Sequence, residues 1–147
     1  MEQFLYVIAN FLSVINIITD LKHRTISNWN CVLIVLGFVI LSTTSIEPIE
    51  IWPRVALSLT TFLIGYVSWL KGWIGAGDVK FLSAIIFWVP IRLFSNFLIA
   101  LAITSLLVGL IGLVYKFYKK PHENISIPYA VPIALSFMTT SYLQFFN

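Results

Sequence analysis

Long apolar segments alternate with short polar connections along the whole chain. Six segments are strongly apolar, and they cover residues 4–19, 29–45, 51–70, 79–93, 96–117 and 127–146. Each approaches the roughly 20 residues that a helix needs to cross a bilayer. The fourth has only about 15 residues, or roughly 22 Å of helix, because a turn signal containing Pro90 and Asn96 follows it. The pattern predicts an all-α, polytopic membrane protein with six transmembrane helices and a single domain, residues 1–147.

Composition narrows the class of protein further. The chain has 147 residues, of which 59% are hydrophobic and 10% are charged. A soluble domain of this length could not bury so much apolar surface. The net charge of +3 is small and dispersed, so we expect membrane lipids and no nucleic acid as partners. Cys31 is the single cysteine, and no Cys/His spacing resembles a zinc site, so neither a metal nor a cofactor is expected.

The basic residues indicate an orientation in the membrane. They gather in alternate connections: Lys22 and Arg24, then Lys71 and Lys80, then Lys116, Lys119 and Lys120. The other connections carry Glu2, Glu47 and Glu50, with Arg54 and Arg92 as basic exceptions. Basic residues favour the cytoplasmic side. We therefore expect a multi-pass protein of the inner (cytoplasmic) membrane, with both chain ends extracytoplasmic.

The chain has two aspartates, and both fall at the cytoplasmic ends of apolar segments. Asp20 follows the first segment, and Asp78 precedes the fourth in the sequence Gly75-Ala76-Gly77-Asp78. The glycines lack a Cβ, so we expect a positive φ or closely packed backbone at Gly77. Gly75, which is farther from Asp78 along the chain, should be less sensitive to substitution.

Two neighbouring carboxylates can carry out acid–base chemistry. They share a proton, because both cannot ionise easily when they are close. The ionised member can then take a proton from water while the protonated member polarises a carbonyl. This is peptide hydrolysis of the aspartic type, without a metal. The alternative is that each aspartate only caps a helix or balances a neighbouring lysine.

Three stretches together resemble the prepilin peptidases, the type IV leader peptidases of the GxGD membrane aspartic protease type. They are Asp20-Leu21-Lys22-His23-Arg24-Thr25-Ile26-Ser27-Asn28, Gly75-Ala76-Gly77-Asp78-Val79-Lys80 and Ile127-Pro128-Tyr129-Ala130-Val131-Pro132. The short Tad/Flp-type form is the most similar. The resemblance implies that Asp20 and Asp78 are catalytic. It also implies cleavage of the basic leader from prepilin-like precursors at the cytoplasmic membrane face, ahead of their hydrophobic segment.

Two departures from the family pattern are visible. Ser27 stands where the family commonly has proline, which leaves that loop less rigid. The cysteine-bearing region with which long members methylate the new N-terminus is missing between the first two segments, so methyltransferase activity is not expected.

Several further residues could contact the substrate or stabilise the loops around the aspartates. Lys22 and Lys80 each lie two residues from an aspartate, and contact with lipid phosphates is favoured over contact with substrate. Asn28 is expected to cap the second helix. Pro128 suits the first turn of the last helix, next to Tyr129, and Pro132 should kink that helix.

Two other functions compete with a peptidase. A small proton- or cation-coupled transporter or channel subunit could use the same aspartates, although transport sites usually lie at the midplane. A structural subunit of a secretion or pilus machine would need no chemistry, but it leaves the glycines around Asp78 unexplained.

Overall fold

The computed structural model describes residues 2–45, 49–118 and 128–146. These residues form six α-helices and one short 3₁₀ helix, and the described part of the chain contains no strand. In chain order they are α1 (Glu2–His23), α2 (Asn28–Thr44), α3 (Ile51–Leu70), α4 (Ala76–Ile86), η1 (Ile91–Leu93), α5 (Phe94–Tyr118) and α6 (Ala130–Phe146). The prediction of an all-helical chain is confirmed.

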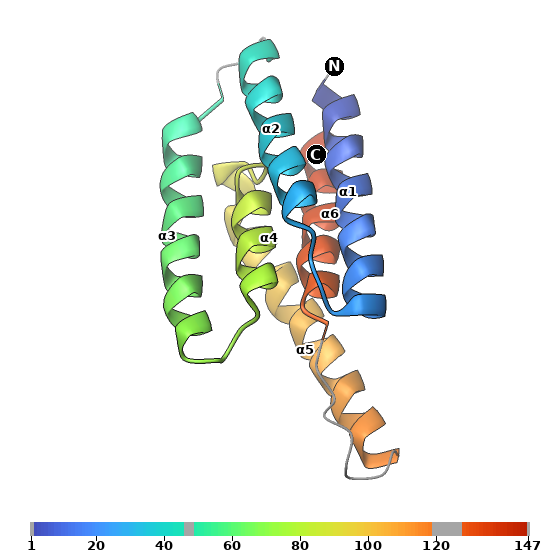
Figure 1. The fold of residues 1–147 in the computed structure, drawn as a ribbon. Helices are drawn as coiled ribbons and strands as arrows, with labels where there is room; N and C mark the ends of the chain where they lie inside the picture. Colours follow the sequence, from blue (N-terminus) through green and yellow to red (C-terminus); the bar gives the residue numbers. More distant parts are fainter. Residues whose placement is uncertain (1, 46–48, 119–127, 147) are drawn as a thin grey trace.

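Helix α4 lies in the middle of the bundle (Figure 1). It packs against α2, α3 and α6, while α1 packs against α2 and α6, and α5 packs mainly on α6. Segments far apart in the sequence therefore meet around one short helix. The first and last helices are among them, so the two ends of the chain contribute to the same core.

The fourth apolar segment is shorter as a helix than we predicted. Helix α4 has 11 residues, or about 16 Å of helix. It ends at Ile86, and the chain turns through Pro90 into η1. The expected helix over residues 79–93 is therefore wrong in length. The side chains of α4 are largely buried by protein, including Phe81 and Ile85, which are each 0% exposed.

Trp88, just beyond α4, ties three parts of the core together. Its indole N–H donates to the carbonyl of Ile34 in α2 at 2.9 Å. Its own carbonyl accepts from the Tyr6 hydroxyl of α1, also at 2.9 Å. Buried Trp and Tyr side chains generally need such partners for their polar atoms. These two bonds fix the end of the α4 segment against α1 and α2.

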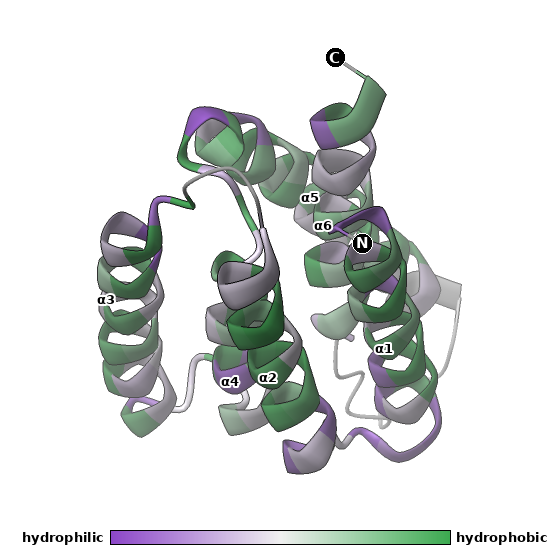
Figure 2. Cartoon of the chain, turned by 90° about the horizontal axis from the view of Figure 1, so that it is seen from above, coloured by the Kyte–Doolittle hydropathy of each residue, from purple (hydrophilic) through white to green (hydrophobic). Residues whose placement is uncertain are grey.

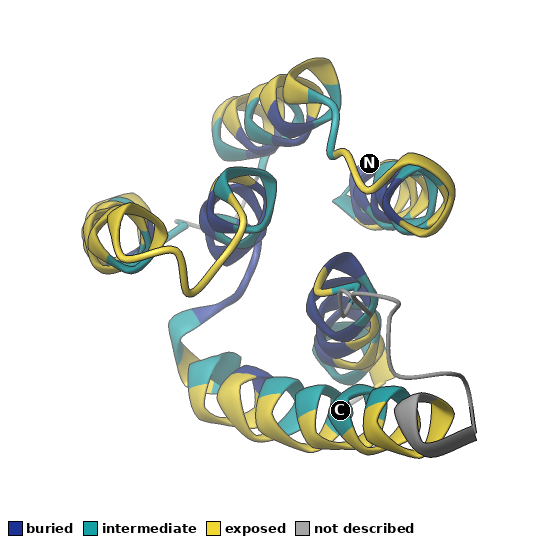
Figure 3. Ribbon diagram, turned by 60° about the horizontal axis from the view of Figure 1, so that its bottom comes forward, coloured by how far each residue is buried: buried dark blue, intermediate teal, exposed yellow. Residues whose placement is uncertain are grey.

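The outer surface of the bundle is strongly apolar. Three helical stretches are long and apolar enough to cross a membrane, namely Glu2–His23, Ile51–Leu70 and Ile91–Tyr115, while α2 and α6 are shorter apolar helices. Figure 2 shows hydrophobic residues along the helices, and Figure 3 shows that α5 is largely exposed while α4 and α6 carry buried faces. These features indicate a membrane protein. Six spans and their orientation stay a prediction.

The start of α6 differs from the sequence-based expectation. The helix begins at Ala130, so Pro128 precedes it and does not occupy its first turn, and Ile127 lies outside the described residues. Pro132 is the third residue of α6. The first amides of a helix have no intrahelical partner in any case, so Pro132 removes no hydrogen bond there. The helix continues to Phe146, and the expected kink stays a prediction.

Candidate active site

The two aspartates line one cavity at the same end of the bundle. Asp20 lies in the last turn of α1, and Asp78 lies in the first turn of α4. The cavity has a volume of about 280 Å³, and its wall includes Arg24, Ile26 and Gly77 besides the two carboxylates. Two separate helices thus bring together the only two aspartates of the chain. They also interact electrostatically, because the Asp20 charge acts on Asp78.

Asp20 is held by the first residue of the last helix. Its side chain is only 7% exposed, and its Oδ2 accepts a hydrogen bond from the Ala130 amide at 3.4 Å. That amide is at the N-terminus of α6, where the helix dipole favours a negative charge. The contact joins residues that are 110 positions apart. No sequence pattern indicates this contact, because a backbone amide is present at nearly every residue.

Asp78 is held by its own helix start. It is the third residue of α4, and its carboxylate accepts a hydrogen bond from the backbone N–H of Gly75, which precedes the helix. An acidic residue in this position commonly bonds back to the amide before the helix. Burial, and then the negative charge of Asp20, raise the pKa of Asp78 to about 6. Asp78 stands at the open end of α4, before the apolar stretch that begins at Val79.

The capping alternative therefore describes real contacts of both aspartates. Asp78 caps α4, and Asp20 bonds to the first amide of α6. Capping alone does not require the two carboxylates to face one open cavity, nor to influence each other's charge. The two roles are compatible, because one carboxylate has two oxygens and about four lone-pair sites.

The two glycines of the loop are constrained by neighbouring side chains. Gly77 is not among the residues with positive φ, but a Cβ on it would lie 3.1 Å from Cβ of Ile26. A Cβ on Gly75 would lie 2.8 Å from Oδ2 of Asp78 itself. Of the two expectations for Gly77, close packing holds and positive φ does not. The expectation that Gly75 is the less sensitive glycine is not supported by this geometry.

The connection between α1 and α2 supplies wall residues that sequence reasoning missed. Arg24 has φ of 53°, an uncommon conformation for a residue other than glycine. Its N–H donates to the Asp20 carbonyl at 2.9 Å, which ends α1. This turn leads the chain across the cavity to Ile26, which packs on Gly77. The one signal in the sequence for this turn was that Arg24, and not glycine, follows the end of the first helix.

The polar residues that we singled out differ in what they contact. Nζ of Lys80 donates to Oδ1 of Asn28 at 3.1 Å, which joins α4 to the start of α2 beside the cavity. Asn28 is the first residue of α2 and does not cap it, because Ser27 occupies the capping position without a side-chain hydrogen bond. The expected cap is therefore wrong. Lys22 is exposed in the last turn of α1.

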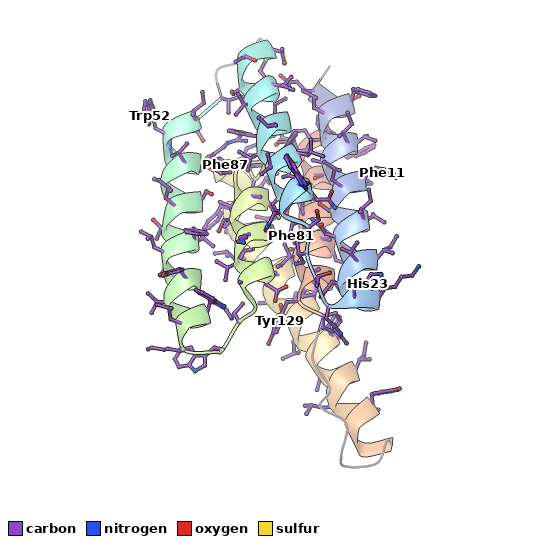
Figure 4. The ribbon with its side chains drawn as sticks, viewed as in Figure 1. Phe11, His23, Trp52, Phe81, Phe87 and Tyr129 are labelled. Carbon is purple, nitrogen blue, oxygen red and sulfur yellow. The ribbon has the colours of Figure 1, made fainter. Side chains whose placement is uncertain are left out.

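A second, apolar cavity lies on another side of Asp78. Its volume is about 120 Å³, and it is lined by Asp78, Gly65, Val79, Leu101, Tyr129 and Ile133 among others. Tyr129 lies near the start of α4 in Figure 4 and is 39% exposed. Pro128 is half-buried next to it, and its carbonyl accepts from the Val131 amide at 3.3 Å. Asp78 thus stands between a polar cavity and an apolar one.

Among the described residues, His, Cys, Asp and Glu form no group of three that could hold a metal ion.

Comparison with known proteins identifies the family of the chain. Residues 6–114 match the model of the type IV leader peptidase family. This stretch includes both aspartates and ends before α6. No curated protein and no solved structure matches the chain. Since the family model covers well over half of the sequence, the chain belongs to the type IV leader peptidase family.

Proposed function

We propose that the protein is an aspartic endopeptidase of the membrane that removes the basic leader from prepilin-like precursors at the cytoplasmic face. One observation carries the proposal: two carboxylates from separate helices line one open cavity, and the charge of one acts on the other. Family membership supplies the reaction class, peptide hydrolysis. Methyltransfer is not part of the proposal.

The surroundings of the two aspartates favour different roles in hydrolysis. The raised pKa of Asp78 favours a proton on its carboxyl group, which donates this proton to the carbonyl oxygen. Asp20 bonds to the amide at the positive end of α6, and it takes a proton from the attacking water. The water oxygen then bonds to the carbonyl carbon. Collapse of this adduct re-forms the C=O bond and breaks the C–N bond: the departing nitrogen takes up the proton that Asp20 removed from water, and the carbonyl oxygen returns its proton to Asp78.

The two cavities beside Asp78 fit the two halves of such a substrate. The polar cavity is open to solvent at the ends of α1 and α4, where a charged leader can stay hydrated. The apolar cavity is bordered by α3, α4, α5 and α6, and its volume of about 120 Å³ suits one apolar side chain at the start of a precursor's hydrophobic segment. A bond between a polar leader and an apolar segment would then lie next to Asp78.

Replacement of each aspartate by asparagine tests the dyad. Asp20→Asn and Asp78→Asn each keep an acceptor oxygen for the capping contacts, so folding and insertion should persist. Cleavage of a purified prepilin-like precursor should fall by at least about a hundredfold in each variant, the lower end of what general acid–base catalysis contributes. The readout is the shortened product on a gel, with thermal stability measured in parallel. Near-normal cleavage by either variant would exclude the dyad.

Reporter fusions test the orientation that the proposal needs. A reporter at Lys119 should lie in the cytoplasm and one at Asn147 outside it, because basic residues cluster in alternate connections. Both positions lie outside the described residues, so the test is independent of the structure. The opposite pattern would place Asp20 and Asp78 away from an uncleaved leader.

A transporter or channel subunit remains the second candidate function. No described observation favours it, because both aspartates lie at one end of the bundle and not at mid-depth.

A further inference from the structure

A large polar cavity lies at the end of the bundle opposite the two aspartates. Its volume is about 560 Å³. It lies where α1 begins, where α2 and α6 end, and where α3 starts (Figure 1). Charged and polar side chains dominate its wall, namely Glu2, Tyr6, Glu50, Arg54, Arg92 and Gln144. None of these residues belongs to the proposed active site.

Arg54 is a buried cation with unused hydrogen-bonding capacity. Its side chain is 7% exposed. One terminal nitrogen, Nη1, donates to the Phe87 carbonyl just beyond α4 at 3.2 Å, and the guanidinium lies 5.8 Å from the centre of the Phe38 ring. Its Nε is buried and has no hydrogen-bond partner. A guanidinium has five N–H donors, and burial of such a group is costly unless the charge is paired. Arg54 thus brings a buried positive charge with spare N–H donors to the wall of the cavity.

Arg92 supplies a second guanidinium to the same wall. It is exposed, and its Nη2 donates to Oε1 of Gln144 at 3.0 Å, which orients the side chain toward the end of α6. The hydroxyl of Tyr6 is hydrogen-bonded to Arg54, and the side chains of Tyr6, Arg54 and Arg92 line the same cavity. Two guanidinium groups on the wall of one cavity are a typical feature of sites that bind phosphate oxygens.

The two glutamates decide which phosphate ester fits. Glu2 and Glu50 line the cavity together with the two arginines, so its described charges balance. A simple anion would meet repulsion from the carboxylates. A zwitterion with a phosphate and a nearby ammonium can satisfy both pairs, since an ammonium has three donors for the carboxylates. The cavity also lies at the ends of apolar helices, the depth at which lipid headgroups surround a membrane protein.

We infer that this cavity binds the phosphoethanolamine headgroup of a membrane phospholipid. The phosphate bonds to Arg54 and Arg92, and the ammonium bonds to Glu2 and Glu50. A primary ammonium distinguishes this headgroup from phosphatidylcholine, which has no N–H donor, and from phosphatidylglycerol, which has no cation. The inference is independent of the proposed peptidase activity.

Lipid retention by the purified protein in detergent tests the inference. Native mass spectrometry would measure binding of phosphatidylethanolamine, phosphatidylglycerol and phosphatidylcholine, added one at a time. The wild-type protein should prefer phosphatidylethanolamine by about tenfold, the effect of one hydrogen bond to a charged group. Arg92→Gln should weaken all three lipids by a similar factor. Glu50→Gln should weaken only phosphatidylethanolamine and so remove the preference.

Controls make each outcome decisive. Arg92 and Glu50 are exposed, so both variants should fold, whereas Arg54→Met removes a buried side chain and would be interpreted only if its thermal stability persists. Lys71→Gln, an exposed change at the opposite end of the bundle, should leave lipid retention unchanged. Equal retention of the three lipids by the wild type would overturn the inference. If free phosphoethanolamine saturates the protein but phosphatidylethanolamine is not retained, the inference that the bound headgroup belongs to a lipid would be overturned.

Discussion

Helices α4 and α5 come from similarly apolar segments, but the protein uses them in opposite ways. Helix α4 has 11 residues and is packed among α2, α3 and α6. Helix α5 has 25 residues, and its large side chains, such as Leu106 and Ile111, are mostly exposed. In a membrane, side chains that face lipid are as apolar as those in the core. Hydropathy therefore does not distinguish the two, whereas the surroundings of their glycines do: a Cβ on Gly77 would meet Ile26, and one on Gly109 would meet nothing within 4 Å.

The sharpest test of this comparison places one substitution on each helix. Gly77→Val in α4 puts a branched side chain where a Cβ alone would lie 3.1 Å from Ile26. The loop that carries Asp78 must then shift, and a displacement of about 1 Å can reduce a rate by roughly a hundredfold. Gly109→Val in α5 is the matched control, because a Cβ there meets nothing within 4 Å. Precursor cleavage would be measured for both, and equal activity would remove the distinction between the helices.

A smaller effect, on stability, is expected where α3 packs on α4. A Cβ on Gly65 would lie 2.6 Å from Cγ1 of Val79, so Gly65→Ala should force the two helices apart. Overpacking of this kind typically costs about 1–3 kcal/mol. Gly109→Ala should be neutral or slightly stabilising, because glycine is a poor helix former by about 1 kcal/mol. Thermal unfolding in detergent would measure both variants. A Gly65→Ala protein as stable as the wild type would show that α3 and α4 adjust freely.

The smallest expected effect is a dependence of stability on pH. Burial and the Asp20 charge raise the pKa of Asp78 from 3.8 to about 6. The folded protein therefore keeps this proton at a pH where the unfolded chain has lost it, so stability falls as the pH rises through the window between these values. Asp78→Asn removes this loss. Its midpoint temperature should exceed that of the wild type by more at about pH 7.5 than at about pH 4.5.

The same pH series carries its own control. Glu50→Gln changes an exposed carboxylate at the far end of the bundle and should follow the wild-type curve. A difference between Asp78→Asn and the wild type that stays constant across the series would show that the Asp78 carboxyl titrates normally.

Sequence patterns predicted the positions of helices better than they predicted the contacts between them. The third segment, 51–70, coincides with α3, because polar or turn-forming residues flank it at both ends. The fourth was overestimated, because Phe87 to Val89 are apolar but turn away from the helix. Asp20 and Asp78 could be paired through charge and topology alone. The bond from Ala130 to Asp20 and the packing of Ile26 on Gly77 could not, since both join parts of the chain whose spatial relation depends on the whole bundle.

The burial of Arg54 could not be predicted from the sequence either. In the sequence, Arg54 is only a basic residue close to a connection in which acidic residues prevail. Its burial against Phe38 and Phe87 follows from the place of α3 beside α4, which no local pattern records.

The bond between Asp20 and Ala130 has a consequence for the order of synthesis. Asp20 is made early, and its partner amide follows 110 residues later, at the start of the last helix. A ribosome that has finished α1 to α5 has already produced both aspartates, but not the group that holds one of them. The carboxylate pair is thus completed only when α6 docks against α1. Under the proposed function, a half-made chain would carry an unassembled centre, and cleavage would wait until the whole bundle has formed.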